Sequence, residues 1–165
     1  ALEKEGRPCK GVLYFGLMIT PSGDIKVLEY NARFGDPEAQ VILPRLKNDL
    51  FDVFNACIDG TLDKITLEWD ERAAVCVVAA SGGYPLKYEK GKKITFGDID
   101  KDAIVFHAGT AICPDCGETV TSGGRVLGVT ALGKTLSEAK AKAYANIKKI
   151  SFEGMFFRSD ICKNH

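Results

Sequence analysis

The chain has 165 residues, 45% of them hydrophobic, and its 22 Lys and Arg side chains balance 22 Asp and Glu side chains. This length suffices for one good-sized domain or two small ones, and the balanced charge gives no field that favours nucleic acid or an anionic membrane. No apolar run approaches the ~20 residues of a membrane span, and the first residues lack the apolar core of a signal peptide. We therefore expect a cytoplasmic protein with no nucleic-acid or membrane partner.

The first predicted element is a β-hairpin. Residues 11–20 are apolar throughout, Pro21-Ser22-Gly23-Asp24 supplies a turn, and residues 25–31 run back. The unbroken apolarity of the first strand predicts burial on both of its faces.

Polar residues end the second strand of this hairpin. Alternation along the strand puts Glu29 and Asn31 on one face, together with Ile25 and Val27. Adjacent oxygen ligands suit a hard cation such as Mg²⁺, which one or two carboxylates and substrate phosphates often hold. Arg33 follows at the same spacing, and its guanidinium matches a phosphate or carboxylate in a bidentate way.

These three residues predict a nucleotide–metal site. The alternatives are an ion pair for Glu29, a turn cap for Asn31 and a solvated surface charge for Arg33, because exposed charged residues are the norm.

Backbone signals follow directly. Gly35 permits a turn that other residues resist, and Asp36 before Pro37 is typical of an N-cap followed by proline at the first helical position. The free N–H groups of such a helix start bind anions. Metal ligands, an arginine and an anion site in one short stretch are hard to explain by packing alone.

Two helices are expected next. Residues 38–43 form a short helix that stops near Pro44. Asn48-Asp49 caps a second helix over residues 50–58, which Gly60 closes. The apolar stripe of this second helix is predicted to face the core; it consists of Leu50, Phe51, Phe54 and Ile58.

The sequence changes in character near residue 65, where we place a domain boundary. Thr135-x-x-Glu138 is a capping box that opens a helix over residues 136–150. The fold class is therefore α+β: a hairpin with helices over residues 1–64, then a small β-rich domain with one packing helix over residues 65–165. The strand-like runs of this second domain cover residues 73–80, 104–108, 110–112 and 126–132.

Three polar segments lie in the second domain. Ser122-Gly123-Gly124-Arg125 precedes a strand, so glycine N–H groups and the arginine could hold a phosphate; an ordinary turn with a surface arginine is the alternative. His107 ends an apolar run and is expected to be a hydrogen-bonded structural residue. Ser81-Gly82-Gly83-Tyr84-Pro85 lacks the Gly-Lys-Ser/Thr that would complete a phosphate loop.

The six cysteines are scattered through a chain with an ample core, which predicts reduced thiols. Cys113-Pro114-Asp115-Cys116 is a C-x-x-C motif that could be half of a zinc knuckle or a redox pair. A tetrahedral zinc site needs two more ligands, and the sequence has no second C-x-x-C and no H-x-x-x-H. The motif is therefore read as a hairpin turn, with a metal or oxidation site as the alternative.

The segment Glu29-Tyr30-Asn31-Ala32-Arg33 resembles the Glu-x-Asn-x-Arg signature of the ATP-grasp ligases. That signature by itself indicates only a superfamily. Its continuation through residues 27–44 resembles the phosphoribosylamine–glycine ligase family, the glycinamide ribonucleotide synthetases. Further resemblances to this family follow in the same order over residues 80–85, 105–110, 123–127 and 152–161.

The resemblance implies ligation of glycine to 5-phosphoribosylamine, with ATP as substrate, through a glycyl phosphate. The products would be glycinamide ribonucleotide, ADP and phosphate. Glu29 and Asn31 would hold Mg²⁺ or Mn²⁺ at the ATP phosphates, and Arg33 would be the catalytic cation beside the transferred phosphate. The glycine and phosphoribosylamine pocket would be bordered by Gly35, Asp36 and Pro37, with a weaker assignment of Arg125 to its closure.

The resemblance also implies a missing partner. A whole member of the family is more than twice this length, and its N-terminal portion supplies the lid over ATP and the adenine pocket. We therefore expect the chain to be inactive without that portion. Another ATP-grasp carboxylate–amine ligase and a non-catalytic binding remnant are the alternatives, although the Gly-Asp-Pro-Glu extension after Arg33 argues against the first.

Overall fold

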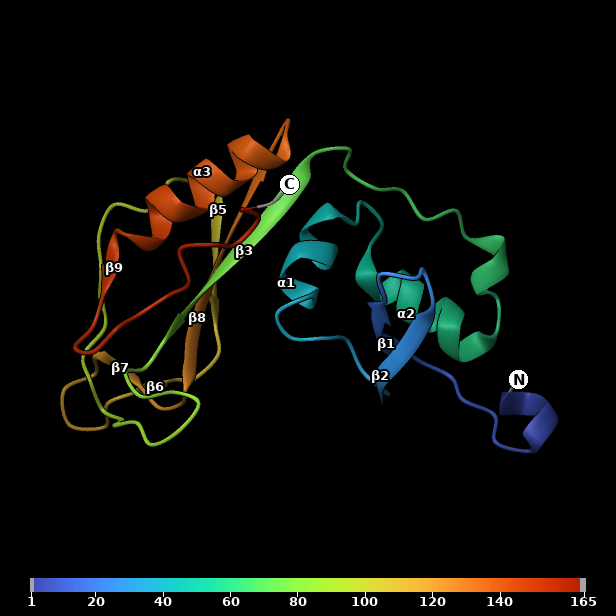
Figure 1. Cartoon of the computed structure of the whole chain (residues 1–165), viewed down its shortest axis with the longest axis horizontal. Helices are drawn as coiled ribbons and strands as arrows, with labels where there is room; N and C mark the ends of the chain where they lie inside the picture. Colours follow the sequence, from blue (N-terminus) through green and yellow to red (C-terminus); the bar gives the residue numbers. More distant parts are fainter. Residues whose placement is uncertain (1, 164–165) are drawn as a thin grey trace. The chain divides into compact units, whose positions relative to one another are not determined.

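A computed structural model describes residues 2–163 (Figure 1). The chain divides into two compact units. Unit 1 combines the residues up to Ala39 with Leu46–Asp70, and unit 2 combines Gln40–Arg45 with the residues from Glu71 onward. Short helices and antiparallel strand pairs make up both units, which confirms the predicted α+β class.

Unit 1 is built on the predicted hairpin. Strand β1 (Tyr14–Ile19) pairs antiparallel with β2 (Ile25–Asn31) after the 3-10 helix η1 (Leu2–Glu5) (Figure 1). The turn closes through a hydrogen bond from Thr20 N to Asp24 O at 2.9 Å, with Gly23 at a φ of +86°. Glycine reaches this left-handed region without steric cost.

The predicted burial of the first strand is wrong. Phe15 and Leu17 are each 50% exposed and Ile19 is 71% exposed, and Gly16 alone in β1 is buried. A two-stranded hairpin buries apolar side chains only against another layer, and the described part of unit 1 does not cover both faces of β1.

The short helices after the hairpin lie close to the ranges that the sequence predicted. Helix α1 (Ala39–Ile42) runs into the 3-10 helix η2 (Leu43–Arg45), so Pro44 falls in the 3-10 turn. Helix α2 (Leu50–Asp59) precedes the 3-10 helix η3 (Leu62–Lys64).

Both caps of α2 form as predicted, but its apolar stripe is not core. Asp49 accepts a hydrogen bond from Phe51 N at 2.8 Å, and Gly60 ends the helix at a φ of +71°. However, Phe51 is 70% and Ile58 62% exposed, and Ala56 is the buried residue of the helix.

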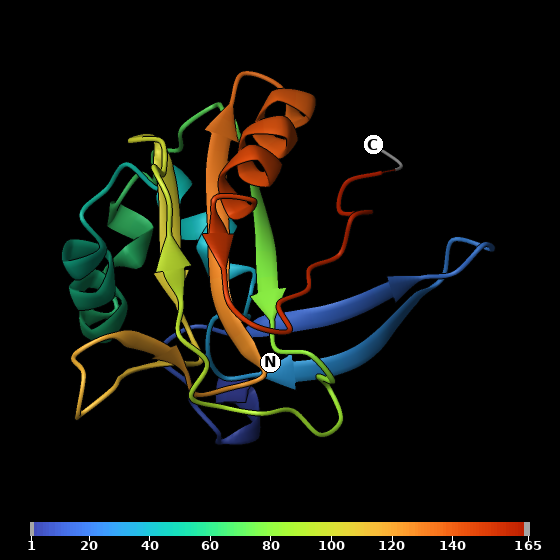
Figure 2. The ribbon, with the colours of Figure 1, turned by 90° about the vertical axis from the view of Figure 1, so that its left-hand side faces the viewer.

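Unit 2 contains a three-stranded antiparallel sheet in the order β3-β8-β5. Its strands are β3 (Ala73–Ala80), β8 (Arg125–Gly133) and β5 (Ala103–His107), and helix α3 (Leu136–Ile147) packs on one face (Figures 1 and 2). Two short antiparallel pairs complete the unit: β4 (Thr95–Phe96) with β9 (Ile150–Ser151), and β6 (Thr110–Ile112) with β7 (Thr119–Thr121).

The core of unit 2 lies between this sheet and α3. Small side chains let the helix approach closely: Ala139 and Ala143 are fully buried, and a Cβ on Gly133 would lie 2.4 Å from Ala139 N. The opposite face of β8 meets the segment 40–45, since Thr130 Oγ1 donates to Gln40 O at 2.9 Å. The central strand is therefore buried on both faces. The core includes Val75, Val77, Ala79, Ile94, Val126, Leu127, Val129, Ala131, Ile147, Ile150 and Phe152.

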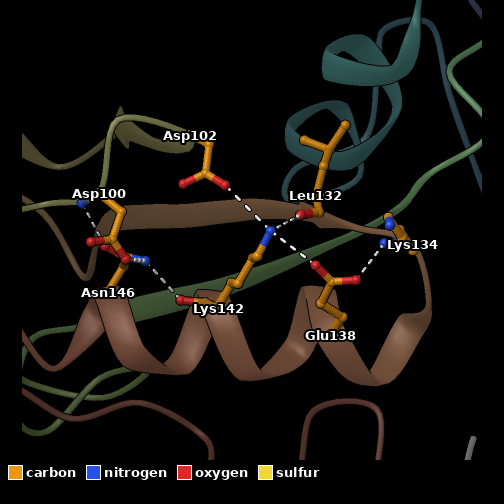
Figure 3. A network of polar contacts seen from close by, with 7 residues as sticks. All are labelled: Asp100, Asp102, Leu132, Lys134, Glu138, Lys142 and Asn146. Carbon is orange, nitrogen blue, oxygen red and sulfur yellow. Dashed lines mark hydrogen bonds and ion pairs between the residues drawn. The ribbon is translucent and has the colours of Figure 1, made fainter.

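A polar network ties the loop before β5 to α3 (Figure 3). Asn146, 1% exposed, donates to Asp100 Oδ2 at 2.9 Å and accepts from Asp100 N at 2.9 Å. Lys142 bridges Glu138 at 3.1 Å and Asp102 at 3.3 Å. Because buried polar groups need partners, this network fixes the loop on the helix.

The capping box of α3 forms with one difference from expectation. Thr135 Oγ1 accepts from Glu138 N at 3.2 Å, whereas Glu138 Oε2 accepts from Lys134 N at 2.8 Å, one residue before the N-cap. Helix α3 ends at Ile147, because β9 begins at Ile150.

Among residues 2–163, no helix combines the length and the apolar character needed to cross a bilayer.

Replacing Asn146 by Ala should lower the free energy of unfolding by about 1–3 kcal/mol, because it leaves the backbone N–H of Asp100 without its acceptor. Urea unfolding followed by circular dichroism measures this change. Lys148→Ala on the exposed end of the same helix is the matched control and should have little effect. Equal midpoints for the two variants would contradict the structural role of Asn146.

The pH dependence of the free energy of unfolding should reflect the ionisation of the Glu138 carboxyl. Its hydrogen bond with Lys142, reinforced by the Lys134 N–H group, holds the pKa of this carboxyl below its ordinary value of 4.5. When folding lowers the pKa of a carboxyl, the resulting stability is fully present at a pH above the pKa of the unfolded state. It is lost as the pH falls through the pKa of the folded state. Glu138→Gln should therefore destabilise the chain at neutral pH, and the difference from wild type should shrink on acidification. Glu68→Gln, which removes the same charge at an exposed position of unit 1, is the matched control.

Candidate functional site

The register of the hairpin decides which polar side chains lie together. Gly16 pairs with Glu29 and Tyr14 pairs with Asn31, and directly paired residues present their side chains on one face. A Cβ on Gly16 would lie 2.9 Å from Glu29 Cγ, so the glycine leaves the space that the Glu29 side chain crosses. The structure thus brings Glu29 and Asn31 together on a polar face.

Alternation along β2 is interrupted, which the sequence did not predict. Leu17 pairs with Val27 while Gly16 pairs with Glu29, so Leu28 is an extra residue in a bulge. The expected shared face of Ile25, Val27, Glu29 and Asn31 therefore does not run through the whole strand. Glu29 and Asn31 follow the bulge and keep their common face.

The opposite face of the hairpin is apolar. Phe15 pairs with Tyr30, and their rings meet edge to face at a centroid distance of 5.1 Å. An apolar hollow of about 860 Å³ opens beside these two rings and reaches Leu13 and Pro8. The hairpin thus separates a face of oxygen ligands from a face of hydrophobic side chains.

Two further polar residues join the Glu29 face. Tyr14 Oη donates to Glu38 Oε1 at 3.0 Å. The hydrogen bond to Glu38 raises the pKa of the Tyr14 hydroxyl, and the negative charges of Glu38 and Glu29 add to this effect. Sequence reasoning assigned no role to Tyr14 or Glu38. The position of the turn alone would have placed Tyr14 opposite Tyr30, and it is the bulge at Leu28 that shifts Tyr14 opposite Asn31.

Gly35 makes room for the Glu38 carboxylate. Gly35 is buried, and a Cβ on it would lie 2.4 Å from Glu38 Oε2. The expected reason for glycine here was a turn conformation closed to other residues. The structure gives a different reason, which is the close approach of a carboxylate to the backbone.

The predicted helix start at Asp36 is wrong. Residues 36–38 form a turn, the Asp36–Pro37 peptide bond is cis, and α1 begins at Ala39. Pro37 is therefore not the first helical residue. A hydrogen bond from Ala39 N to Gly35 O at 3.0 Å closes the turn.

Arg33 follows the hairpin with an exposed side chain. Its Nη1 donates to Phe34 O at 2.7 Å, which folds the guanidinium back on its own backbone. A guanidinium carries five N–H donors in a planar fork, so this hydrogen bond leaves most of its donor capacity for an anion.

Arg125 belongs to unit 2, at the start of β8, with an exposed side chain. Backbone hydrogen bonds fix the loop before Arg125 to the segment at Gly109. Ser122 N and Gly123 N both donate to Gly109 O, at 2.7 and 3.2 Å. These two N–H groups are thus engaged within the fold. The alternative of an ordinary turn accounts for this loop better than a phosphate cradle does.

Other predictions for unit 2 are settled by local contacts. His107 Nδ1 lies 3.1 Å from Thr110 Oγ1, which confirms a hydrogen-bonded structural histidine. Ser81 Oγ donates to Gly123 O at 2.8 Å, so the Ser81 loop also has a structural role.

The donor set on the polar face of unit 1 fits a hard divalent cation. Glu29 offers a carboxylate and Asn31 an amide oxygen, and the glycine opposite Glu29 leaves room for the Glu29 side chain to cross the neighbouring strand. Across residues 2–163, no group of three or more His, Cys, Asp or Glu side chains could hold a metal ion. A cation here would therefore take its remaining ligands from elsewhere, as Mg²⁺ does when it bridges protein carboxylates and substrate phosphates.

Comparison with known proteins identifies relatives over the whole chain. Residues 74–164 match the family described as "Phosphoribosylglycinamide synthetase, C domain", and residues 1–39 match "Phosphoribosylglycinamide synthetase, ATP-grasp (A) domain". The chain is 53% identical over 165 residues to the phosphoribosylamine–glycine ligase of Caldanaerobacter subterraneus subsp. tengcongensis and 52% identical over 164 residues to that of Synechocystis sp.. These alignments cover 100% and 98% of this chain but 39% of each relative.

Solved structures give the same picture. The crystal structure of phosphoribosylamine–glycine ligase from Thermotoga maritima matches 97% of this chain and 39% of its own length, with a TM-score of 0.81 and 40% identity. A biotin carboxylase from Campylobacter jejuni matches 94% of this chain and 37% of its own length, with a TM-score of 0.62. At 11% identity this second likeness shows the fold alone.

Replacing Glu38 by Gln should lower the pKa of Tyr14 towards its ordinary value of 10.0, because the substitution removes the charge and weakens the hydrogen bond that raise it. NMR of chain labelled at the tyrosine ring carbons follows this titration directly. Glu5→Gln, distant in the sequence and exposed, is the matched control and should leave Tyr14 unchanged. An unchanged Tyr14 titration in the Glu38 variant would contradict the contact.

Proposed function

The chain belongs to the phosphoribosylglycinamide synthetase family, and we propose from this that it is the metal-bearing part of an ATP-grasp ligase that joins glycine to 5-phosphoribosylamine. The observation that carries the proposal is the polar face of the hairpin, where Glu29 and Asn31 lie side by side opposite Gly16 and Tyr14. The supporting comparison is an identity of about half to phosphoribosylamine–glycine ligases over the whole chain.

In this proposal Glu29 and Asn31 hold Mg²⁺ or Mn²⁺, and ATP is the phosphoryl donor. A cation held there would neutralise charge on the ATP phosphates, since phosphoryl transfer depends on positioning and electrostatic stabilisation. Arg33 is the catalytic cation, because its remaining guanidinium donors suit the transferred phosphate.

The turn after Arg33 borders the pocket for glycine and phosphoribosylamine. We assign this border to Gly35, Asp36 and Pro37, and the hydrogen bond from Tyr14 to Glu38 holds the turn against the hairpin. Arg125 of unit 2 remains a secondary candidate for binding substrate.

The domain assignment follows the same reasoning. We propose that residues 1–64 are the C-terminal part of an ATP-grasp domain and that residues 65–165 are the C-terminal domain of the family. The matches to the A domain over residues 1–39 and to the C domain over residues 74–164 support this division.

The chain spans 39% of the length of the relatives that it matches. We propose that the N-terminal portion of the longer polypeptide covers the apolar surfaces of unit 1 and completes the ATP site. The exposure of large hydrophobic side chains on both the hairpin and α2 supports this partner, because a folded protein rarely leaves such a surface open without a use for it. These side chains include Phe15, Leu17, Ile19, Ile25, Leu28, Tyr30, Phe51 and Ile58.

Mixing the chain with the N-terminal portion of a longer relative should restore ADP release that depends on ATP, glycine and 5-phosphoribosylamine. Glu29→Gln should reduce this activity by at least about a hundredfold, since it removes a metal ligand charge, with little loss of stability at an exposed position. A coupled ADP assay measures the rate, and circular dichroism confirms that the variant is folded.

Glu68→Gln is the matched control and should retain full activity. Full activity of the Glu29 variant would overturn the metal assignment. Turnover with bicarbonate and biotin in place of glycine and phosphoribosylamine would instead indicate a different ATP-grasp ligase. Calorimetry that detects neither Mn²⁺ nor nucleotide binding by the mixture would indicate a non-catalytic remnant.

A further inference from the structure

The Cys-Pro-Asp-Cys segment forms a closed turn between β6 and β7. Cys113 N donates to Glu118 O at 2.8 Å, and Gly117 N donates to Cys113 O at 2.9 Å, with Gly117 at a φ of +68°. The bond from Gly117 N to Cys113 O spans four residues and encloses both cysteines in one turn of the backbone. The two thiols thus lie within one turn, close enough for a hydrogen bond between their side chains.

The two sulfur atoms have different surroundings. Cys113 Sγ accepts hydrogen bonds from the Cys116 thiol and from the backbone N–H groups of Cys116 and Asp115, and these bonds lower the pKa of the Cys113 thiol. The hydrogen bond with Cys113 is the largest cause that raises the pKa of the Cys116 thiol, and Cys116 Sγ also lies in donor geometry 3.9 Å from Glu118 Oε2. The negative charge of Glu118 opposes the first shift and adds to the second.

The turn is open to small molecules and fixed to its surroundings. Cys116 is exposed and Cys113 is half-buried. An ion pair between Lys93 and Glu118 and a hydrogen bond from Ile94 N to Thr119 O at 2.9 Å hold the end of the turn to the neighbouring segment. The thiols can therefore react without a large movement of the backbone.

We propose that Cys113 and Cys116 form a reversible intramolecular disulfide by exchange with a low-molecular-weight disulfide. The Cys113 thiolate attacks one sulfur of the small disulfide, forming a mixed disulfide and releasing one small thiolate. The Cys116 thiol then loses its proton and attacks Cys113 Sγ, which releases the second small thiol. The small disulfide is reduced to two thiols while the protein dithiol is oxidised, so electrons balance and no other oxidant is needed.

A metal site is the competing use of two such cysteines. The described chain offers these thiols no cluster of three or more His, Cys, Asp or Glu ligands, whereas a structural zinc site takes four. The other cysteines also lie outside any C-x-x-C spacing: Cys9, Cys57, Cys76 and Cys162.

The test equilibrates the 165-residue chain in buffers of varied reduced and oxidised glutathione. After acid quench and alkylation, peptide mass spectrometry should find a peptide that links Cys113 to Cys116 and has lost two hydrogen atoms. The four remaining cysteines of the same chain serve as internal controls. They should remain free thiols during the equilibration and should therefore be recovered as alkylated cysteines. A chain in which no disulfide joins Cys113 to Cys116 at any glutathione ratio would overturn the proposal.

Two variants test the order of the steps. Cys116→Ser should trap glutathione on Cys113, and Cys113→Ser should react at Cys116 about tenfold more slowly, because the thiolate is the nucleophile. Limiting iodoacetamide on the unsubstituted chain gives the same comparison without any substitution and should label Cys113 first. Faster labelling of Cys116 would overturn the assigned roles, and zinc binding at the reduced pair with loss of exchange would assign the turn to a metal instead.

Discussion

The antiparallel pairing of β1 with β2 determines which chemical groups of unit 1 act together. Placing Gly16 opposite Glu29 leaves open the space that the glutamate side chain needs, and placing Tyr14 opposite Asn31 brings a hydroxyl to the same face. The Tyr14 hydroxyl reaches Glu38 at 3.0 Å, which ties the turn after the hairpin to the hairpin itself. Glycines at two positions therefore serve the same purpose, because each gives a carboxylate side chain room beside the backbone.

The two units differ in how far their apolar side chains are buried. In unit 2 the central strand β8 is buried on both faces, and Ala139 and Ala143 bring α3 close to it. In unit 1 the side chains with the largest apolar surface are exposed on the hairpin and on α2. Since burial of apolar surface is the main favourable contribution to folding, the described hydrophobic core of unit 2 contributes more to stability than the exposed apolar side chains of unit 1.

Polar contacts in unit 2 are used mainly to fix loops. Asn146 hydrogen-bonds to both the backbone N–H and the carboxylate of Asp100. Ser81 donates a hydrogen bond to the carbonyl of Gly123. The glycine-rich loop before Arg125 donates its N–H groups to Gly109. The Cys113–Cys116 turn also closes through backbone hydrogen bonds, and the pKa values of its two thiols are shifted in opposite directions.

The sequence by itself determined the element types, the caps of α2 and α3, and the identity of Glu29, Asn31 and Arg33 as neighbours in a ligase signature, because these depend on spacing within a short stretch. It did not determine burial: the apolar strand β1 and the stripe of α2 have the composition of core, yet burial depends on whether another layer covers them. The sequence also did not predict the bulge at Leu28, the start of α1 at Ala39, or the hydrogen bond from Tyr14 to Glu38. Only the tertiary structure decided these, because pairing register and side-chain contacts between distant residues leave no periodic trace in the chain.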